Sequence, residues 1–449
     1  FDYHIMKQRF NHPFKSSWIR SKPNPTSIKS SIAKYFETRP SRPIDSRYSS
    51  AIFKARKDFS LPFAINPMHV NDVIRHYQHP ERSPGLPYTR QGFKRKDEVD
   101  PNIIKMSVHH MKYGTWKKCK TPCNAVAKTA VHPTEEKLRL IWVYPTHMTF
   151  AEGMFAMPLI HAYKAVNPPW RYALWVRYQR GDMRFMRSLK PRSWHWLALD
   201  WSSFDATVPA WLIRDAFAIL RDQLDFSKYQ FRGKPTDASS LPNLWKCIIN
   251  YFINTPIRDP DGKIHVKAGG VPSGSYFTNL IDSIACAIAI HYLLSDTVYS
   301  QEAFWVMGDD ALVAIRDKLD LNKFAATAKM VFGFVLNVDK TEIGEFPPFL
   351  GFRLSASGMP ESDYERLMAQ LVHPARPDYT LEQFAARIRA LQLASFGGNK
   401  RFLYETQTYL NSVHMPDPPP LLSKRDELRT KLEALGLEGW PPLERVMIL

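Results

Sequence analysis

Two short apolar segments on either side of residue 309 constrain the fold of this chain more than any other feature. Phe304–Met307 and Ala311–Ile315 each have the length of a β-strand, and only Gly308-Asp309-Asp310 separates them. Glycine and aspartate favour tight turns, so the pattern predicts a β-hairpin whose tip carries two carboxylates. The fold is therefore expected to contain a sheet with an acidic turn at its edge.

A third carboxylate stands in a similar position earlier in the chain. Trp194–Leu199 is a short apolar strand, and Asp200 follows its last residue. Three carboxylates at one sheet edge repel each other unless cations lie between them. Asp200, Asp309 and Asp310 are therefore suited to hold two Mg²⁺ ions, with Mn²⁺ as a substitute. One ion would lower the pKa of a ribose 3′-hydroxyl, and the other would hold a triphosphate. Taken singly, each Asp could equally be a turn or helix-capping residue.

Several polar residues near these strands could surround a nucleotide. Asp205 lies on the turn into the next helix and can accept a hydrogen bond from a substrate hydroxyl. Ser273-Gly274 begins a loop of small residues that lets backbone approach a nucleotide closely. Thr278 and Asp282 share one face of the following helix, where they could read a ribose 2′-hydroxyl. The alternative is a tight helix start capped by a serine.

Basic residues could grip the phosphates of the same nucleotide. Lys137 and Arg139 alternate with apolar residues, so they share one face of a predicted strand, and Lys128 precedes them. Lys340 could donate a proton to a leaving pyrophosphate. In isolation, a basic edge strand and a solvated surface lysine explain these residues equally well.

The distribution of charge supports a polyanionic partner. The formal net charge is +18, but residues 1–199 have a balance of +22 and residues 200–449 one of −4. A basic part beside an acidic part fits a surface that guides nucleic acid to a cation-binding centre. A solvated basic surface without a specific partner is the alternative.

Cysteine content and hydropathy indicate where such a chain works. Four cysteines are too few for a disulfide framework, although Cys119-x3-Cys123 with His109 and His110 could be read as a zinc site. No segment resembles a signal peptide or is apolar for long enough to span a membrane, so we expect a protein that is not secreted. The chain begins with Phe1 rather than Met, which suggests a preceding segment.

The order of predicted elements is typical of an α+β fold. A strand at 194–199 is followed by a helix after Pro209, a hairpin at 255–266 turned at Asp261-Gly262, and a helix at 277–294. The acidic hairpin, a helix at 321–332 and a third hairpin near 349–359 come next. This order predicts an antiparallel sheet with helices on one face. Two further helices are expected at 380–395 and 423–435, so the C-terminal part is predicted to be mainly helical.

Taken in order, these segments resemble the motif series of viral RNA-dependent RNA polymerases. The series comprises Ser83-Pro84-Gly85-Leu86-Pro87-Tyr88 (motif G), Lys137-Leu138-Arg139-Leu140-Ile141 (motif F), Asp200-x4-Asp205 (motif A), Ser273-Gly274-x3-Thr278 (motif B), Gly308-Asp309-Asp310 (motif C), Asp339-Lys340 (motif D) and Phe349-Leu350-Gly351-Phe352 (motif E). The sequence of residues 271–278, together with Asp282-Ser283 and residues 141–145, is most similar to that of partitivirus polymerases. Picobirnavirus polymerases are near relatives. The main departure is Asp282, because asparagine is usual there.

The resemblance implies a right-hand architecture of fingers, palm and thumb, with an antiparallel palm sheet and a mainly helical thumb. Fingers would comprise 1–193 and an insertion at 224–262, palm 194–223 and 263–354, and thumb 355–449. The implied activity is template-directed transfer of a nucleoside monophosphate to an RNA 3′ end, for replication and transcription of a double-stranded RNA virus.

The resemblance also implies residue roles and partners. The expected catalytic and metal-binding residues are Asp200, Asp309 and Asp310, with Lys340 as general acid. The expected substrate-binding residues are Asp205, Ser273, Gly274, Thr278, Asp282, Lys128, Lys137 and Arg139. The expected template-binding residues are Ser83, Gly85, Pro87 and Tyr88. Partners would be RNA template, product duplex, NTPs and viral capsid protein, in the virion interior or host cytoplasm. A reverse transcriptase-like polymerase and a non-catalytic RNA-packaging protein are the alternatives.

Overall fold

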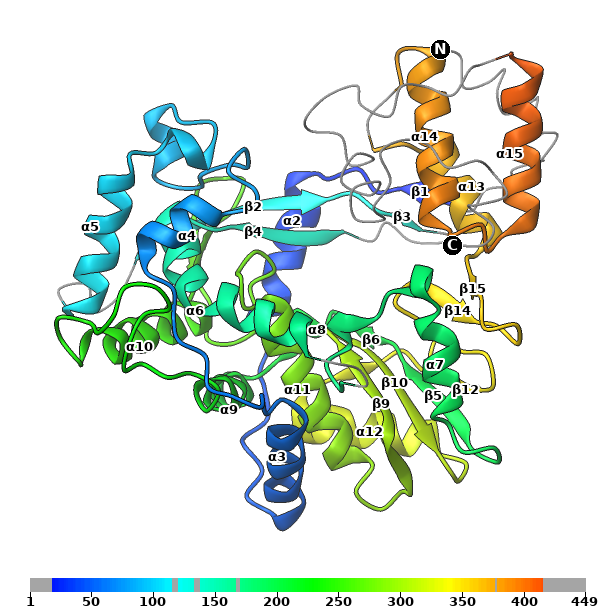
Figure 1. The fold of residues 1–449 in the computed structure, drawn as a ribbon, viewed down its shortest axis with the longest axis horizontal. Coiled ribbons are helices and arrows are strands. Elements are labelled where there is room, and N and C mark those ends of the chain that lie inside the picture. The colour runs from blue at the N-terminus through cyan, green and yellow to red at the C-terminus, as the bar shows by residue number, and fades with distance from the viewer. Residues whose placement is uncertain (1–17, 115–119, 133–137, 167–169, 376–377, 415–449) are drawn as a thin grey trace.

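The computed structural model describes residues 18–414, except 115–119, 133–137, 167–169 and 376–377. Within this range the chain forms two four-stranded sheets, each with its own helices, and a separate bundle of helices at the C-terminal end (Figure 1). The predicted helix at 423–435 lies outside the described residues.

The first sheet, called the central sheet below, is antiparallel throughout. Its strand order is β12 (Glu342–Gly344), β5 (His195–Leu199), β10 (Asp310–Ile315) and β9 (Tyr299–Met307). The strand predicted at 194–199 and the hairpin turned at Gly308 are both confirmed. Gly308 has φ +65°, a backbone conformation that glycine adopts without strain.

Both faces of the central sheet are covered, so the prediction of helices on one face only was incomplete. Leu197, Leu199 and Val306 point into the main core, where helices pack. Trp196 and Trp305 point to the other face and pack against a second cluster. The reason is that β10 is apolar at consecutive positions, and a strand that is apolar on both sides must be covered on both. The second cover consists of α7 (Asp182–Ser188) and the small sheet of β13 (Pro348–Phe349), β14 (Phe352–Leu354) and β15 (Pro360–Glu361).

Helices cover the first face, and they include the helices predicted after Pro209, at 277–294 and at 321–332, whereas the helix at 46–58 was not predicted. The helices at this face are α3 (Ser46–Asp58), α9 (Ala210–Arg221), α11 (Thr278–Leu293) and α12 (Leu321–Phe332). α11 follows the small-residue loop directly. α12 ends where Gly333 adopts a left-handed conformation with φ +78°, as its sequence predicts.

The second sheet has the order β4 (Arg139–Val143), β2 (Cys123–Lys128), β7 (Pro256–Arg258) and β8 (Ile264–Val266). β2 and β7 are parallel, and the other pairs are antiparallel. The predicted hairpin with Gly262 at its turn is confirmed. The expected division of the chain between residues 262 and 263 therefore falls inside this hairpin. Helices around the second sheet are α2 (Pro25–Ala33), α4 (Val70–His76), α5 (Pro101–Lys112), α6 (Thr146–Ala165) and α10 (Ser240–Ile253).

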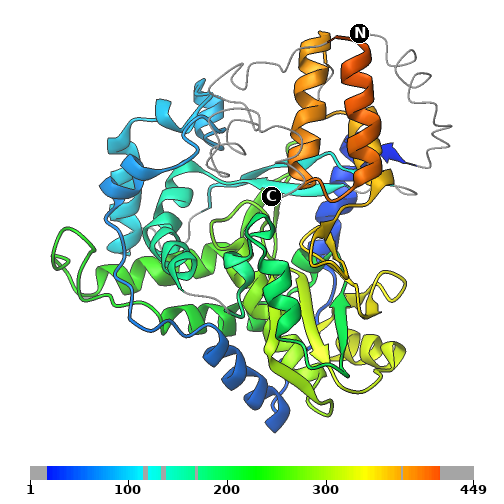
Figure 2. The ribbon, with the colours of Figure 1, turned by 45° about the vertical axis from the view of Figure 1, so that its right-hand side comes forward.

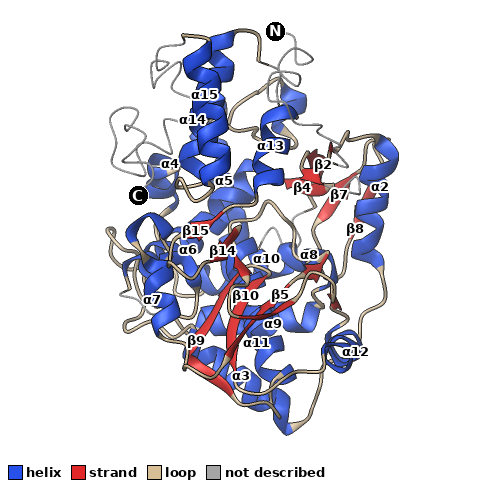
Figure 3. Cartoon of the chain, turned by 90° about the vertical axis from the view of Figure 1, so that its right-hand side faces the viewer, coloured by secondary structure: helices blue, strands red, loops and turns tan. Residues whose placement is uncertain are grey.

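The C-terminal bundle has a core of its own. It comprises α13 (Tyr364–Val372), α14 (Leu381–Ala394) and α15 (Lys400–Ser412). The predicted capping of α14 is confirmed, since the Thr380 hydroxyl accepts a hydrogen bond from the Gln383 N–H at 3.2 Å. In Figures 2 and 3 the bundle stands above the central sheet and beside the strands of the second sheet.

The N-terminal segment joins these parts. β1 (Ile19–Arg20) pairs with β3 (Val131–His132), and the Arg20 side chain donates to the His373 carbonyl in the bundle. The remaining elements are short: β6 (Trp201–Ser202), β11 (Val335–Leu336), α8 (Phe204–Thr207) and the 3-10 turns at Lys34–Phe36, Tyr88–Gln91, Lys96–Glu98, Ala173–Trp175 and Tyr178–Arg180. Among the described residues, no helix combines the length and the apolar character needed to cross a membrane.

Candidate active site

Asp200, Asp309 and Asp310, called the acidic group below, lie at one edge of the central sheet. Asp309 lies with Gly308 in the turn between β9 and β10, and Asp310 is the first residue of β10. Because Ala311 pairs with Leu199, the antiparallel register places Asp310 opposite Asp200. The backbone of Asp200 is held on both sides: its N–H donates to the Thr341 hydroxyl at 3.2 Å, and its carbonyl accepts from the Asn337 N–H at 2.8 Å.

Burial and neighbouring negative charges raise the pKa of Asp309 and of Asp310. Burial, followed by the charges of Asp310 and Asp205, raises the pKa of Asp309 to about 6. Burial and the charge of Asp200 raise the pKa of Asp310. The positive charge of Arg139 acts in the opposite direction on both. Both side chains remain accessible to solvent, so a cation from solution can reach them.

This donor set fits a hard divalent cation. Carboxylate oxygens that repel one another are the ligands that Mg²⁺ prefers. Among the described residues, no group of three His, Cys, Asp or Glu side chains is placed to hold a metal ion. Of the alternative zinc site, Cys119 lies outside the described residues. Cys123 is buried with its sulfur 3.5 Å from the Tyr251 hydroxyl, which gives no support to zinc binding.

The loop before α11 contacts Asp205 directly. The Ser273 hydroxyl donates a hydrogen bond to the Asp205 carboxylate, and the Val271 N–H donates to the Asp205 carbonyl at 2.6 Å. Thr278, by contrast, uses its hydroxyl inside the loop, where it donates to the Pro272 carbonyl at 2.9 Å. The structure therefore brings Asp205 and Ser273 together and gives Thr278 a role in shaping the loop.

Asp282 lies one helical turn beyond Thr278 and is buried, with 3% of its surface exposed. Burial, followed by the charges of Asp205 and Asp309, raises its pKa well above the ordinary value. Its Oδ1 atom has no hydrogen-bond partner among the described residues. The unusual residue of the series is thus a buried acid beside Asp205 and the acidic group, and its surroundings favour the protonated form.

Gly274 is required because the loop approaches strand β4 closely. A Cβ atom at this position would lie 1.9 Å from the Trp142 carbonyl oxygen. The Trp142 N–H donates to the Ser273 carbonyl at 3.0 Å, which joins the loop to the strand. Gly274 therefore lets the loop approach the backbone of β4 closely. This contact places the strand that carries Arg139 beside the loop.

Two expected phosphate-binding residues lie side by side on neighbouring strands of the second sheet. Lys128 and Arg139 are directly opposite in the β2–β4 ladder, and both are exposed. Like charges in such a pair repel, so an anion between them would relieve the repulsion. Lys137 lies outside the described residues.

Lys340 lies on the exposed turn that holds the backbone of Asp200. Its N–H donates to the Asn337 carbonyl at 3.2 Å, and its side chain is exposed to solvent. Arg366, on α13 of the bundle, was not singled out from the sequence. Its charge acts on Asp310, so a cationic side chain of the bundle faces the acidic group.

The four expected template-binding residues are placed differently from one another. Ser83 and Pro87 are exposed, whereas Gly85 is buried. A Cβ atom on Gly85 would lie 2.5 Å from the Tyr144 carbonyl oxygen. Tyr88 is also buried, with its hydroxyl 2.8 Å from His147 Nδ1. Only Ser83 and Pro87 can therefore contact a template RNA strand directly, whereas Gly85 and Tyr88 anchor the segment to the core.

Other residues around the site were missed because their partners are distant in sequence. The buried carboxylate of Glu152 accepts hydrogen bonds from the Ser275 hydroxyl at 2.7 Å and the Tyr276 N–H at 2.8 Å. The Ser283 hydroxyl accepts from the Gly308 N–H at 2.7 Å and so connects α11 to the acidic turn. For Glu152, the sequence did offer a signal, because it is an acidic residue within the apolar segment 146–165.

With this geometry established, the relation to known proteins is clear. A sequence profile described as "Viral RNA-dependent RNA polymerase" matches residues 6–410. The chain belongs to this family. The ordered motif series is therefore that of a viral RNA-dependent RNA polymerase, and the resemblance expected from the sequence is confirmed.

Two viral RNA-directed RNA polymerases illustrate the relation. That of Cryptosporidium parvum virus 1 (strain KSU-1) is 29% identical over 324 residues, which cover 66% of this chain and 59% of the relative. That of White clover cryptic virus 1 is 23% identical over 329 residues, or 63% of this chain and 50% of the relative. The chain thus spans between half and three fifths of the length of these relatives.

Solved structures confirm the right-hand polymerase fold. The RNA-dependent RNA polymerase of a human picobirnavirus has a TM-score of 0.66 at 14% identity, covering 90% of this chain and 78% of that one. Its insertion-loop deletion mutant has a TM-score of 0.69, covering 99% and 87%. At this identity the likeness concerns the fold, and the α+β class with an antiparallel sheet was predicted correctly.

Proposed function

We propose that this member of the viral RNA-dependent RNA polymerase family copies RNA, joining nucleoside monophosphates to an RNA 3′ end as a template directs. The observation that carries the proposal is the acidic group at the end of β5, β9 and β10, with the loop at Ser273 beside it. A non-catalytic packaging protein has no use for three repelling carboxylates at a sheet edge.

In this proposal Asp200 and Asp309 hold two Mg²⁺ ions, or Mn²⁺ in their place, with Asp310 supporting them. The bound cations supply an activated 3′-hydroxyl and neutralise the phosphate charge. The 3′-hydroxyl gives its proton to water, its oxygen forms a bond to the α-phosphorus, the bond from that phosphorus to the bridging oxygen breaks, and pyrophosphate leaves. Lys340, on the turn beside Asp200, donates a proton to the pyrophosphate.

The other site residues position the incoming nucleotide. We propose that Arg139 and Lys128, with Lys137, grip its triphosphate, because their paired charges attract an anion. Asp205, Ser273 and Asp282 surround the ribose. Gly274 and Thr278 shape the loop that presents these groups, and Ser83 and Pro87 line the path of the template strand.

We further propose a division into fingers, palm and thumb that follows the expected one except at one boundary. Both strands of the hairpin β7–β8 belong with the fingers, so the insertion extends from 224 to 266. The palm then comprises 194–223 and 267–354. RNA template, product duplex and NTPs are the proposed partners. Contact with a viral capsid protein, and a place in the virion interior or host cytoplasm, are proposed from the family resemblance.

An extension assay tests the proposal. The purified chain is given a single-stranded RNA template, four NTPs and Mg²⁺, and the products are separated by size. We expect products complementary to the template, none with EDTA, and truncated products when one NTP is omitted. RNA that is bound but never extended would contradict the proposal and support a packaging protein. Preferred extension with deoxynucleotides would support a reverse transcriptase-like enzyme.

A further inference from the structure

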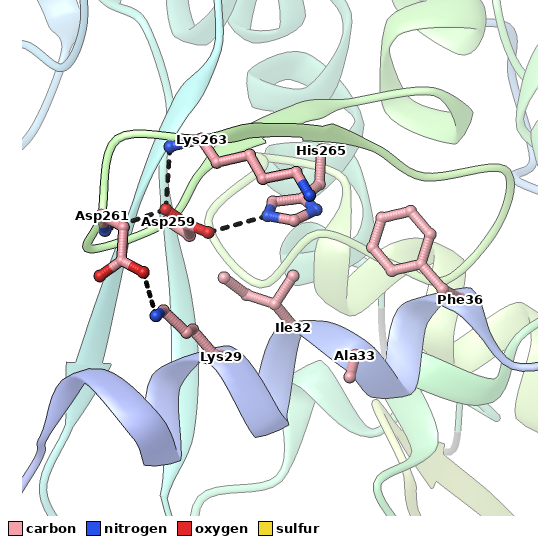
Figure 4. Close-up of a pocket in the computed structure, with 8 residues that line it drawn as sticks. All are labelled: Lys29, Ile32, Ala33, Phe36, Asp259, Asp261, Lys263 and His265. Atoms are coloured by element: carbon pink, nitrogen blue, oxygen red, sulfur yellow. Dashed lines mark hydrogen bonds and ion pairs between the residues drawn. The ribbon is translucent and has the colours of Figure 1, made fainter.

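Two pockets of similar size differ in how their charges are compensated. The first, of about 470 Å³, lies between α2 and the hairpin β7–β8 (Figure 4). Its charged groups pair with each other: Lys29 with Asp261, and His265 with Asp259 at 2.9 Å. The first pair attaches the helix to the hairpin and the second lies within the hairpin, and together they leave little net charge for a ligand.

The second pocket, called the basic pocket below, has a volume of about 390 Å³ and lies among α4, α5, α10 and the loop at 229–236. In Figure 1 these elements lie on the left, away from β9 and β10, which are drawn right of the centre. Six basic residues line it, and no described Asp or Glu does. The six are His69, Lys105, His109, Lys112, Arg232 and Lys234.

The charges of the basic pocket are largely uncompensated. Arg232 pairs with Asp72 at 2.7 Å, but Lys105, Lys112 and Lys234 form no ion pair with any described residue. The Lys112 ammonium donates to the Tyr229 hydroxyl at 2.8 Å and lies 5.1 Å from the centre of its ring. Burial lowers the pKa of Lys112 to about 8, and burial, followed by the charges of Lys112 and Arg232, lowers the pKa of His69. An anion in the pocket would relieve this repulsion.

The shape and the rings of the basic pocket indicate which anion it suits. Its volume lies within the range of about 300–1,000 Å³ found for small-ligand pockets. This volume is larger than a single phosphate group occupies. Tyr229 packs edge-on against His69 with ring centres 5.2 Å apart, and His109 lies 4.5 Å from Tyr113. Rings beside lysines offer contacts to a base or ribose as well as to phosphates.

We propose that the basic pocket binds the phosphate groups of a nucleotide unit, outside the catalytic site. The nucleotide is either a free NTP or a unit of an RNA strand, since both carry the same phosphate chemistry. The inference goes beyond the proposed polymerase activity, and binding at this pocket requires no catalysis.

The test measures binding in EDTA, so that cation-dependent binding at the acidic group does not contribute. The ligands are GTP, a short 5′-triphosphorylated RNA and the same RNA with a 5′-hydroxyl. The variant Lys105→Glu/Lys234→Glu reverses two uncompensated charges of the pocket. The control Lys323→Glu/Lys329→Glu makes the same change of net charge at exposed positions of α12. Lys234→Glu alone, at an exposed loop position, provides a milder variant should the double variant fold poorly.

We expect the pocket variant to bind the triphosphorylated RNA about tenfold or more weakly, with a salt dependence reduced by about two phosphate contacts. Loss confined to this RNA assigns a 5′ end, equal loss for both RNAs assigns internal phosphates, and loss for GTP alone assigns a free nucleotide. Each of these outcomes supports the pocket. Equal weakening by the control variant, or no change in either variant for any ligand, would overturn the proposal.

Discussion

Asp309 and Asp310 are adjacent in the sequence but have different neighbours in the fold. Asp310 is opposite Asp200 across the strand pair, whereas the pKa of Asp309 responds to Asp310 and Asp205. The proposed function makes Asp309 a metal ligand and gives Asp310 a supporting role. The register gives Asp310 an equally direct relation to Asp200, so the division of roles between them stays a prediction.

Asp282 allows a specific prediction about ribose recognition. Its carboxyl is buried beside Asp205, and burial with the neighbouring negative charges raises its pKa well above the ordinary value, which favours the protonated form that resembles an asparagine in shape. We expect Asp282→Asn to incorporate ribonucleotides within about threefold of the wild-type rate, and Asp282→Leu to lose much of the preference for ribonucleotides over deoxyribonucleotides. Rates with GTP and dGTP measure this, and a collapse of activity in the Asn variant would show that an ionisable group is required.

Lys340 is predicted to speed the departure of pyrophosphate without being indispensable. General acid catalysis contributes about 10²–10⁴-fold, so Lys340→Leu should slow single-nucleotide incorporation by that amount and leave RNA binding intact. Lys329→Leu, on exposed α12, is the matched control. If the Lys340 variant is as fast as the control, the residue is a surface lysine.

At the scale of elements, the sequence predicted individual helices and hairpins well, but it predicted few of the contacts between them. The bounds of α12 and the hairpins at Gly308 and Gly262 followed from periodicity and turn residues, which are local signals. The packing of Gly274 against Trp142 and the hydrogen bonds of Glu152 could not be predicted, because they join segments that are distant in sequence. The identities of the acidic residues were predicted, but not what holds them in place.

Glu152 provides a test of how α6 positions the loop before α11. Burial raises the pKa of its carboxyl to about 8 from an ordinary 4.5, so between these values the folded chain keeps a proton that the unfolded chain has released. The free energy of unfolding must therefore fall as pH rises through this window, by up to about 1.4 kcal/mol per pH unit. We expect Glu152→Gln to remove this contribution and become more stable relative to wild type as pH rises.

The control for that experiment is Glu302→Gln, at an exposed position. Glu152→Ala should behave differently, since it leaves the Ser275 hydroxyl and the Tyr276 N–H without an acceptor, at a cost of about 1–3 kcal/mol. Denaturant unfolding at several pH values measures both effects. An identical pH dependence in wild type and Glu152→Gln would show that this carboxyl does not hold a proton in the folded chain.

For the whole molecule, the sequence predicted the fold class and the family but not how the parts are joined. The N-terminal segment reaches the C-terminal bundle through Arg20 and His373, and Tyr35 donates to the Val271 carbonyl in the loop beside the site. Such contacts connect residues hundreds of positions apart and have no periodic signature. The charge division has a structural counterpart: Arg139 comes from the basic part, and the carboxylates it faces come from the acidic part.

The most direct test of this account compares single-nucleotide incorporation on a fixed RNA template by wild type, Asp309→Asn and Asp317→Asn across a Mg²⁺ titration. Asp317 is exposed beyond the far end of the same strand pair, so it controls for the charge change. We predict that Asp309→Asn lowers the rate by roughly 10³-fold or more, with RNA affinity kept, because a cation ligand contributes several kcal/mol to the transition state. An Asp309→Asn enzyme that incorporates nucleotides as fast as Asp317→Asn would contradict the assignment of this carboxylate, and with it the catalytic role of the acidic group.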